Sequence, residues 1–171
     1  MPEITRQFSA GGVVYKRVKD KKVLWLVSKS RPSRLYPESV WRFPKGWIDD
    51  KRGGKKPGEL ASGKKRAKEE DLRKTAIREV KEEAGVEAKI IEKIGTERYF
   101  LTISNQRTLK FVTFYLMKWS KDLASGFGPE TSEIKWLPFE EARKKLSYSG
   151  EKKILDKGRE ILKSGIQETL V

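Results

Sequence analysis

The segment Arg78-Glu79-Val80-Lys81-Glu82-Glu83-Ala84-Gly85-Val86 carries most of the information about the fold of this chain. It ends a helix that we predict over 69–84, where acids at the start suit the helix dipole and Gly85 is a typical C-terminal stop. A buried stripe with a spacing of four residues runs along this helix, formed by Leu72, Ala76, Val80 and Ala84. Because each residue turns a helix by about 100°, Glu79 and Glu83 project within about 40° of each other, at the edge of that stripe.

Three carboxylates, those of Glu79, Glu82 and Glu83, crowd the end of this helix. They repel one another unless a cation lies among them, and a divalent metal supplies that cation. Arg78 can hold one carboxylate by a bidentate contact. The alternative is a solvated charged face, which suits a chain rich in Lys and Glu. We favour the metal site, because the acids, the stop at Gly85 and an upstream Trp-x-Phe-Pro-Lys-Gly turn occur together.

The sequence around this helix predicts strands and two closing helices. We expect strands at 8–16, 22–30, 41–44, 87–96, 109–119 and 134–137, a turn at Lys45-Gly46, and amphipathic helices at 139–146 and 150–162. Strands interrupted by one central helix and followed by helices favour a mixed α/β sandwich. We expect residues 1–171 to form a single domain.

Residues 51–68 form an unusually basic stretch. They include eight basic residues and one acid, so this stretch carries +7 of the total net charge of +15. The stretch is rich in Gly and shows no apolar periodicity, which favours a mobile loop. Its charge beside the acidic helix suggests a lid that closes over a phosphate-rich substrate.

Composition excludes several kinds of chemistry. The 171 residues include no Cys and no His, so disulfides, thiolate metal sites and His-containing catalytic triads are impossible. Acid–base and metal chemistry therefore falls to carboxylates, which favour Mg²⁺, Mn²⁺ or Ca²⁺. The positive charge predicts attraction to nucleotides, inositol phosphates, RNA or anionic membranes, although it also serves solubility. Without a membrane-spanning apolar run or a signal peptide, we expect a cytoplasmic protein.

The acidic segment resembles the box of the Nudix hydrolase family, G-x5-E-x7-R-E-U-x-E-E-x-G-U, where U is a bulky aliphatic residue. Its second half is filled by Arg78, Glu79, Val80, Glu82, Glu83, Gly85 and Val86, and Gly46 matches the opening Gly. The chain departs from the box between Gly46 and Glu70, where 23 residues replace five and the 18 extra residues form the basic stretch. Both Glu70 and Glu59, the latter in Pro57-Gly58-Glu59, suit the first box Glu, and helical spacing favours Glu70.

Segments outside the box are similar to the branch of asymmetric diadenosine tetraphosphate hydrolases and diphosphoinositol polyphosphate phosphohydrolases. Trp41-x-Phe-Pro-Lys-Gly46 resembles its W-x-x-P-K-G, and 110–116 resembles its K-x-V-x-(aromatic)-(aromatic)-L strand. Residues 136–142 match W-L-x-x-E-E-A, with Glu130 as the acidic loop residue ahead of it. The family also implies an α/β/α sandwich with a mixed sheet and a central catalytic helix.

The resemblance implies roles for individual residues. Mg²⁺, or Mn²⁺ in its place, would be bound by Glu79, Glu82, Glu83 and the backbone carbonyl of Gly46. Arg78 would orient Glu79. Glu130 would complete the metal shell or activate water, unless it is an ordinary surface residue of its loop. Glu79 and Glu133 are the alternatives for activating water. We add Lys45 and Lys110 as candidate phosphate ligands, with an exposed solubilising lysine as the alternative for each. Tyr99 is a candidate base contact, whereas Tyr115 suits the core.

These roles predict Mg²⁺-dependent cleavage of the pyrophosphate linkage in a nucleoside diphosphate joined to another moiety. Our preferred substrate is a dinucleoside polyphosphate such as diadenosine tetraphosphate, cleaved to a nucleoside triphosphate and a monophosphate. Removal of pyrophosphate from an RNA 5′ end and hydrolysis of diphosphoinositol phosphates are alternatives. A non-catalytic module that binds polyanions is the rival of a different class, but binding alone does not need so many acids beside an anion. The sequence leaves the oligomeric state undetermined.

Overall fold

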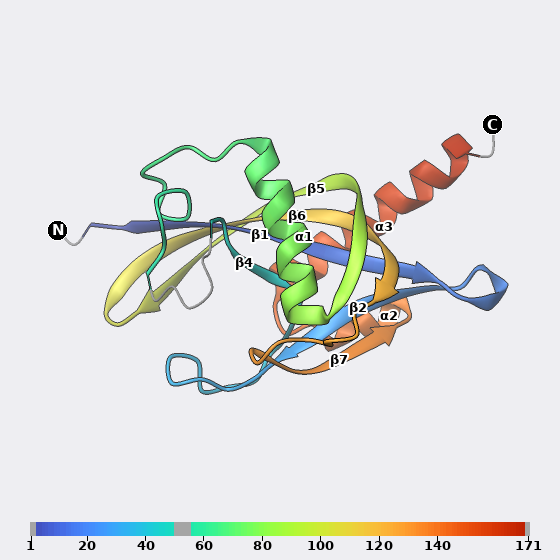
Figure 1. Ribbon diagram of the computed structural model, residues 1–171, viewed down its shortest axis with the longest axis horizontal. Helices are drawn as coiled ribbons and strands as arrows, with labels where there is room; N and C mark the ends of the chain where they lie inside the picture. Colours follow the sequence, from blue (N-terminus) through green and yellow to red (C-terminus); the bar gives the residue numbers. More distant parts are fainter. Residues whose placement is uncertain (1–2, 50–55, 170–171) are drawn as a thin grey trace.

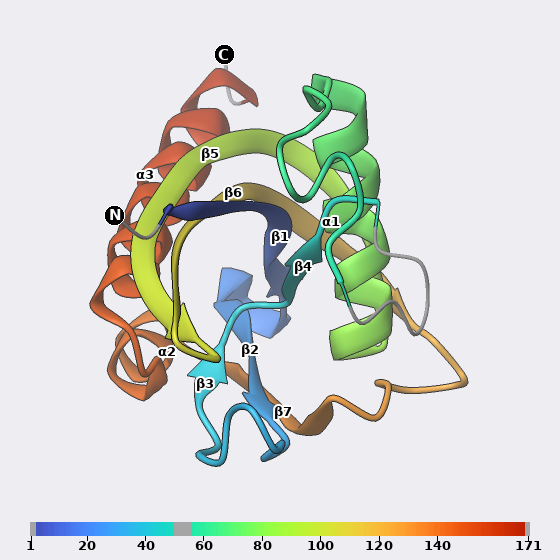
Figure 2. The same ribbon diagram turned by 90° about the vertical axis from the view of Figure 1, so that its left-hand side faces the viewer.

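The computed structural model describes residues 3–49 and 56–169, with side chains described as far as residue 165. A mixed β-sheet forms the central layer, with helix α1 on one face and helices α2 and α3 on the other (Figures 1 and 2). In chain order, the elements are β1 (Thr5–Arg17), η1 (Lys19–Lys21), β2 (Val23–Ser30), β3 (Trp41–Arg42), β4 (Lys45–Trp47), α1 (Glu69–Ala84), β5 (Val86–Ile103), β6 (Gln106–Asp122), β7 (Thr131–Leu137), α2 (Phe139–Lys145) and α3 (Ser149–Thr169). This α/β/α sandwich confirms the predicted fold class. Among the described helices, none combines the length and apolar character needed to cross a membrane.

The parallel pairing of β1 with β6 forms the centre of the sheet, which has the strand order β3-β2-β1-β6-β5. Strands β5 and β6 form a long antiparallel hairpin with bulges, which curves around the molecule in Figure 2. Strand β2 pairs with β1 near its start, and with β3 and β7 farther along. The short strand β4 pairs with β1, so that Gly46 lies opposite Ala10.

Two hydrophobic clusters attach the helices to the two faces of the sheet. The cluster beneath α1 contains Ala10, Val14, Leu26, Ala76, Val80, Ala84, Val86, Ala88, Tyr115 and Met117. The cluster beneath α2 and α3 contains Phe43, Phe114, Leu116, Ala142, Leu155 and their neighbours. Full burial of one large apolar side chain contributes about 1.5–3 kcal/mol, so these contacts hold each helix firmly against the sheet.

Helix α1 spans Glu69–Ala84, as predicted, and both of its ends are held. At its start, the Asp71 carboxylate accepts a hydrogen bond from the Lys68 backbone N–H at 2.8 Å. Gly85 ends it with φ 68°, and a Cβ there would overlap the backbone of Gly126. The Gly128 N–H donates to the Glu82 carbonyl at 2.6 Å, so the loop before β7 clamps the end that carries the acids.

Two local predictions were wrong. The expected turn at Lys45-Gly46 is instead strand β4, because the backbone of β1 offers it partners. Strands β5 and β6 extend well beyond 87–96 and 109–119. Each strand satisfies the backbone hydrogen-bonding groups of the other, so the hairpin continues through 97–103 and 106–108, beyond the segments that we predicted.

The described part of the basic stretch forms hydrogen bonds to neighbouring segments, and the mobility that we expect for 51–68 stays a prediction. Residues 51–55 lie outside the described residues. In the remainder, the backbone N–H groups of Leu60 and Ala61 each donate to the Asp49 carboxylate at 3.3 Å. The Ala61 carbonyl accepts from the Phe8 N–H at 2.7 Å, and Ala61 is fully buried. Residues 56–68 therefore pack on β1 as a series of turns, and the lid hypothesis stays a prediction.

Candidate active site

Two acidic side chains of α1 face the backbone of strand β4. Glu79 and Glu83 lie near the end of the helix and are only 3% and 4% exposed. A Cβ added to Gly46 would overlap the Glu79 carboxylate. The backbone N–H of Lys45 donates to Glu83 Oε2 at 3.0 Å. The four-residue spacing of these acids therefore places two buried carboxylates against one short strand.

Glu83 is held at both its side chain and its backbone. Arg42 Nη2 lies 3.5 Å from Glu83 Oε1, and Thr131 Oγ1 donates to the Glu83 carbonyl at 2.7 Å. Burial is the main cause that raises the pKa of Glu83 to about 8; Arg42 opposes this rise and the Glu79 charge adds to it. The positive charge of Arg42 therefore does not offset the cost of burying Glu83 beside Glu79, and a bound cation would supply further positive charge.

Arg78 connects three groups at the same place. Its Nη2 donates to Glu79 Oε1 at 3.1 Å and to the Trp47 carbonyl at 2.9 Å. Its Nε lies 3.8 Å from Glu82 Oε1. Arg78 therefore attaches Glu79 to strand β4, which is the geometry that the predicted orienting role requires.

The chemistry around Gly46 fits a hard divalent cation. Glu79 and Glu83 provide oxygen donors that repel each other, and the absence of a side chain at Gly46 lets the Glu79 carboxylate lie against the backbone of β4. The Glu82 side chain is 34% exposed and lies on the side of Arg78. Within the described residues, no three acidic side chains come close enough together to hold a metal ion. Two of the three predicted carboxylates thus converge, and Glu82 would have to turn to join them.

The loop before β7 brings Glu130, but not Glu133, toward these carboxylates. The exposed Glu130 side chain lies near enough to contribute to the raised pKa of Glu83. Glu133 instead lies on β7 opposite Lys29 and 3.8 Å from Lys135. This placement favours Glu130 over Glu133 as the group that activates water, a role that stays a prediction.

Lys45 forms a buried ion pair, so it is not an exposed solubilising lysine, and its role as a phosphate ligand stays a prediction. Its Nζ lies 3.0 Å from Glu151 Oε2 and 3.3 Å from the Tyr99 hydroxyl. Burial alone would lower the pKa of Lys45, but attraction to Glu151 outweighs burial and raises it above the usual value. The first role of Lys45 is therefore to join α3 to the segment β3–β4, because its side chain already has a carboxylate partner.

Lys110 lies near Lys45 and Arg42, and its role as a phosphate ligand stays a prediction. It pairs with Tyr99 across the β5–β6 hairpin, and among the described residues no hydrogen bond or ion pair engages its amine. Burial, together with the charges of Lys45 and Arg42, lowers the pKa of Lys110 to about 8. An unpaired amine beside two other cations is suited to bind a phosphate. Tyr115 is fully buried in the core, as expected.

Sequence reasoning missed two residues of this site, Glu151 and Arg42. Glu151 lies in the first turn of α3 and is 1% exposed; its Oε1 accepts from the Phe43 N–H at 2.7 Å. An acid at the start of a predicted helix already suits the helix dipole, so the sequence offered no reason to place it in a site. Arg42 occupies the unspecified second position of the Trp-x-Phe-Pro-Lys-Gly motif. Only its guanidinium group, which can pair with a carboxylate, could have indicated a role in the site.

The two candidates for the first box Glu are both exposed. Glu70 is 71% exposed and pairs with Lys74 at 2.8 Å, nine residues before Glu79 or about 13.5 Å along the helix. Glu59 is exposed in the turns after Pro57. The choice between Glu59 and Glu70 therefore stays open.

Comparisons of sequence place the chain among known proteins. A family model described as NUDIX domain matches residues 5–157. The chain is 29% identical over 158 residues to the putative mutator protein MutT4 of Mycobacterium tuberculosis (strain CDC 1551 / Oshkosh). That match covers 90% of this chain, which spans about half, 55%, of the length of that relative.

Solved structures share the fold at low sequence identity. The binary complex of C. elegans Ap4A hydrolase aligns with a TM-score of 0.61 and 22% identity, covering 92% of this chain and 98% of that one. The NUDIX domain of Shewanella oneidensis NrtR, solved with ADP ribose, aligns with a TM-score of 0.58 and 16% identity, covering 92% and 88%. At these identities the likeness concerns the fold alone.

Proposed function

This chain belongs to the NUDIX family, and from that premise we propose that it hydrolyses the pyrophosphate linkage of a nucleoside diphosphate joined to another moiety. The proposed cofactor is Mg²⁺, with Mn²⁺ as a substitute. The proposed substrate is a dinucleoside polyphosphate, which would yield a nucleoside triphosphate and a nucleoside monophosphate. The observation that carries this proposal is the buried pair Glu79 and Glu83 packed against the backbone at Gly46.

In this proposal each acidic residue has a defined task. A divalent cation, when bound, neutralises phosphate oxygens and lowers the pKa of the attacking water. Glu79 and Glu83 would hold it, with the Gly46 carbonyl and Glu82 as further ligands. Arg78 fixes Glu79 by its hydrogen bond at 3.1 Å. Glu130 would accept the proton of the attacking water.

Basic and aromatic residues near the carboxylates would supply the contacts to substrate. Lys110 would bind a phosphate oxygen directly, since its amine has no ion pair within the described residues. Arg42, beside Glu83, and the buried Lys45 add positive potential. Tyr99, half-buried next to them, would contact the base. The motif likeness to diadenosine tetraphosphate hydrolases and the shared fold of the C. elegans enzyme support this substrate class.

A second candidate function is removal of pyrophosphate from the 5′ end of RNA, using the same carboxylates. The net charge of +15 favours it, because a basic surface attracts the remainder of an RNA chain. Diphosphoinositol phosphates, also densely charged, form a third substrate class, and binding without turnover is the rival of a different class.

Product analysis tests the proposal. The full chain with Mg²⁺ is incubated with diadenosine polyphosphates, triphosphorylated or capped RNA, and diphosphoinositols. We expect turnover of a diadenosine polyphosphate and a decrease in kcat of about 10²- to 10³-fold for Glu83→Gln, the range for loss of one charge-stabilising group. Glu92→Gln, which removes an exposed acid on β5, is the matched control and should leave kcat unchanged. Equal rates in the two variants would reject the site, and no turnover of any substrate would favour a binding module.

A further inference from the structure

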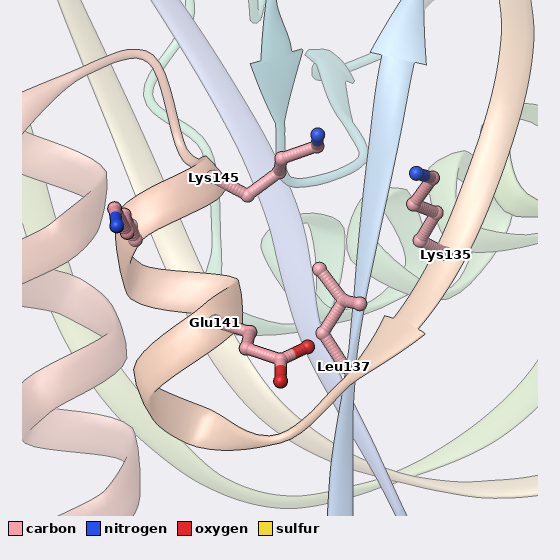
Figure 3. A pocket seen from close by; sticks show the side chains of 5 residues that line it. Lys135, Leu137, Glu141 and Lys145 are labelled. Atoms are coloured by element: carbon pink, nitrogen blue, oxygen red, sulfur yellow. The ribbon is translucent and has the colours of Figure 1, made fainter.

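Three lysines surround Trp41 on the face of the sheet that carries α2. The distances from the indole centroid are 5.1 Å to Lys145 Nζ, 5.5 Å to Lys135 Nζ and 6.0 Å to Lys29 Nζ. A pocket of about 370 Å³ lies beside them, lined by Lys135, Leu137, Glu141, Lys144 and Lys145. In Figure 3, Lys135 and Lys145 extend from β7 and α2 toward each other across this space. We use the name lysine pocket for the group formed by Trp41, Leu137, Glu141 and the four lysines Lys29, Lys135, Lys144 and Lys145.

The lysine pocket holds more positive charge than nearby acids neutralise. Cation–π attraction at an exposed site contributes only about 0.5–1 kcal/mol per contact, which does little to offset repulsion among the amines. In the part of the chain that the structure describes, Lys29 and Lys145 form no ion pair. Lys135 has only Glu133 at 3.8 Å, where both side chains are well exposed. Glu141 is the single acid in the lining, so the pocket favours an anionic ligand.

The lysine pocket adjoins the candidate active site through the link between α2 and α3. The Trp41 N–H donates to Ser147 Oγ at 2.9 Å, and the Ser147 N–H donates to the Trp41 carbonyl at 3.0 Å. The next residue, Tyr148, is 47% exposed, and its ring lies 5.8 Å from Lys45 Nζ. An exposed aromatic side chain thus follows the residue that is hydrogen-bonded to Trp41, and lies beside Lys45.

We propose that the lysine pocket binds the phosphodiester backbone of single-stranded nucleic acid, with a base stacked on Tyr148. Amines on α2, β7 and β2 suit a ligand that repeats its phosphates, and the exposed Tyr148, next in the chain to the Ser147 that contacts Trp41, suits the unpaired bases. A membrane fits less well, because the pocket is concave and no large exposed apolar side chain of the described residues lines it. This binding is independent of the hydrolysis proposed above.

Fluorescence anisotropy with a labelled single-stranded RNA of about 12 nucleotides and a 5′ hydroxyl tests the proposal. The full chain is compared with Lys135→Gln/Lys145→Gln. The matched control is Lys89→Gln/Lys118→Gln, two exposed lysines opposite each other on β5 and β6. Lys118 lies eight residues along β6 from Lys110, roughly 26 Å away in an extended strand. Both double variants remove the same charge, so any difference in RNA affinity between them reflects where the replaced lysines lie.

We expect the pocket variant to lose at least about tenfold in affinity, and the control to lose less than about threefold. Lost phosphate contacts also reduce the slope of log affinity against log salt, by about 0.7 for each lysine in single-stranded ligands. Equal losses in both variants would overturn the proposal. It would also be overturned if only tripolyphosphate, or only phosphatidylserine vesicles, depended on Lys135 and Lys145. Hydrolysis of a diadenosine polyphosphate should be the same in both variants, which separates this result from the proposed enzymatic function.

Discussion

At the scale of single residues, Gly46 shows how closely strand β4 and helix α1 approach. A Cβ at this position would lie within the Glu79 carboxylate, which Arg78 holds from the other side. Glu79 therefore cannot keep its place if position 46 gains a side chain. Glycine is required here because of this close approach and not because of a left-handed backbone conformation, since φ at Gly46 is not positive.

We expect Gly46→Ala to lower kcat by about 10²-fold, because displacement of a reacting group by about 1 Å has that effect. Overpacking should also decrease the free energy of unfolding by about 1–3 kcal/mol. Steady-state kinetics and urea denaturation measure the two effects. Gly165→Ala is the control, since a Cβ there meets nothing within 4 Å. Full activity of Gly46→Ala would contradict the placement of Glu79.

Lys110 is the residue whose charge should respond to pH in the working range. Its folded pKa of about 8 lies below the usual 10.5, so the charged form is present below pH 8 and is lost as pH rises through 8. We expect KM for a polyphosphate to rise between about pH 7 and pH 9. In Lys110→Arg the charge persists, so that rise should be absent while kcat keeps its own pH profile. A parallel rise in both proteins would assign the effect to another group.

The same shift has a consequence for stability. Between pH 8 and 10.5 the unfolded chain binds more protons at this position than the folded protein. The burial of the charged amine therefore costs stability below pH 8, and this cost is relieved as pH rises toward 10.5.

At the scale of elements, the first turn of α3 is joined to the segment β3–β4 by Glu151. One carboxylate oxygen accepts from the Phe43 N–H and the other pairs with Lys45. Since both Lys45 and Glu151 are buried, each needs the other to be satisfied. Strand β4, which faces the acids of α1, is thus also held by helix α3.

We expect Glu151→Leu to lower the free energy of unfolding by about 3–5 kcal/mol, because the Lys45 charge would stay buried without a partner. The double variant Lys45→Met/Glu151→Leu should recover most of that loss, as the charge is then removed as well. Urea denaturation of the two single variants and the double variant measures the coupling. A double variant as unstable as the sum of its single variants would show that the pair acts as two separate residues.

At the scale of the whole molecule, the net charge of +15 should raise the rate of encounter with polyphosphates. The Debye length shortens from about 21 Å to about 7 Å between about 20 and 200 mM KCl. We expect kcat/KM to decrease several-fold over this range with kcat unchanged. Replacement of Lys64, Lys65 and Arg66 by Gln should reproduce part of this decrease at low salt. If this triple variant had the same KM as the unmodified chain at low salt, the basic stretch would have no role in substrate capture.

Some features of the protein follow from the sequence alone, because they are local. The bounds of α1 follow from the apolar spacing of Ala76, Val80 and Ala84 and from the stop at Gly85. The convergence of Glu79 and Glu83 follows from the helical repeat, and the exclusion of His or Cys chemistry follows from composition. Each of these needs only residues that are neighbours along the chain.

Only the tertiary structure decided what the carboxylates face and how they are held. Glu151 lies 106 positions from Lys45, and Arg42 lies 41 positions from Glu83, so no periodicity relates them. Their meeting depends on the pairing of β4 with β1 and on the packing of α1 and α3 on opposite faces of the sheet. The burial that shifts the pKa of Glu83 and Lys110 likewise exists only after these layers close, because desolvation is a property of the packed molecule and not of a residue type.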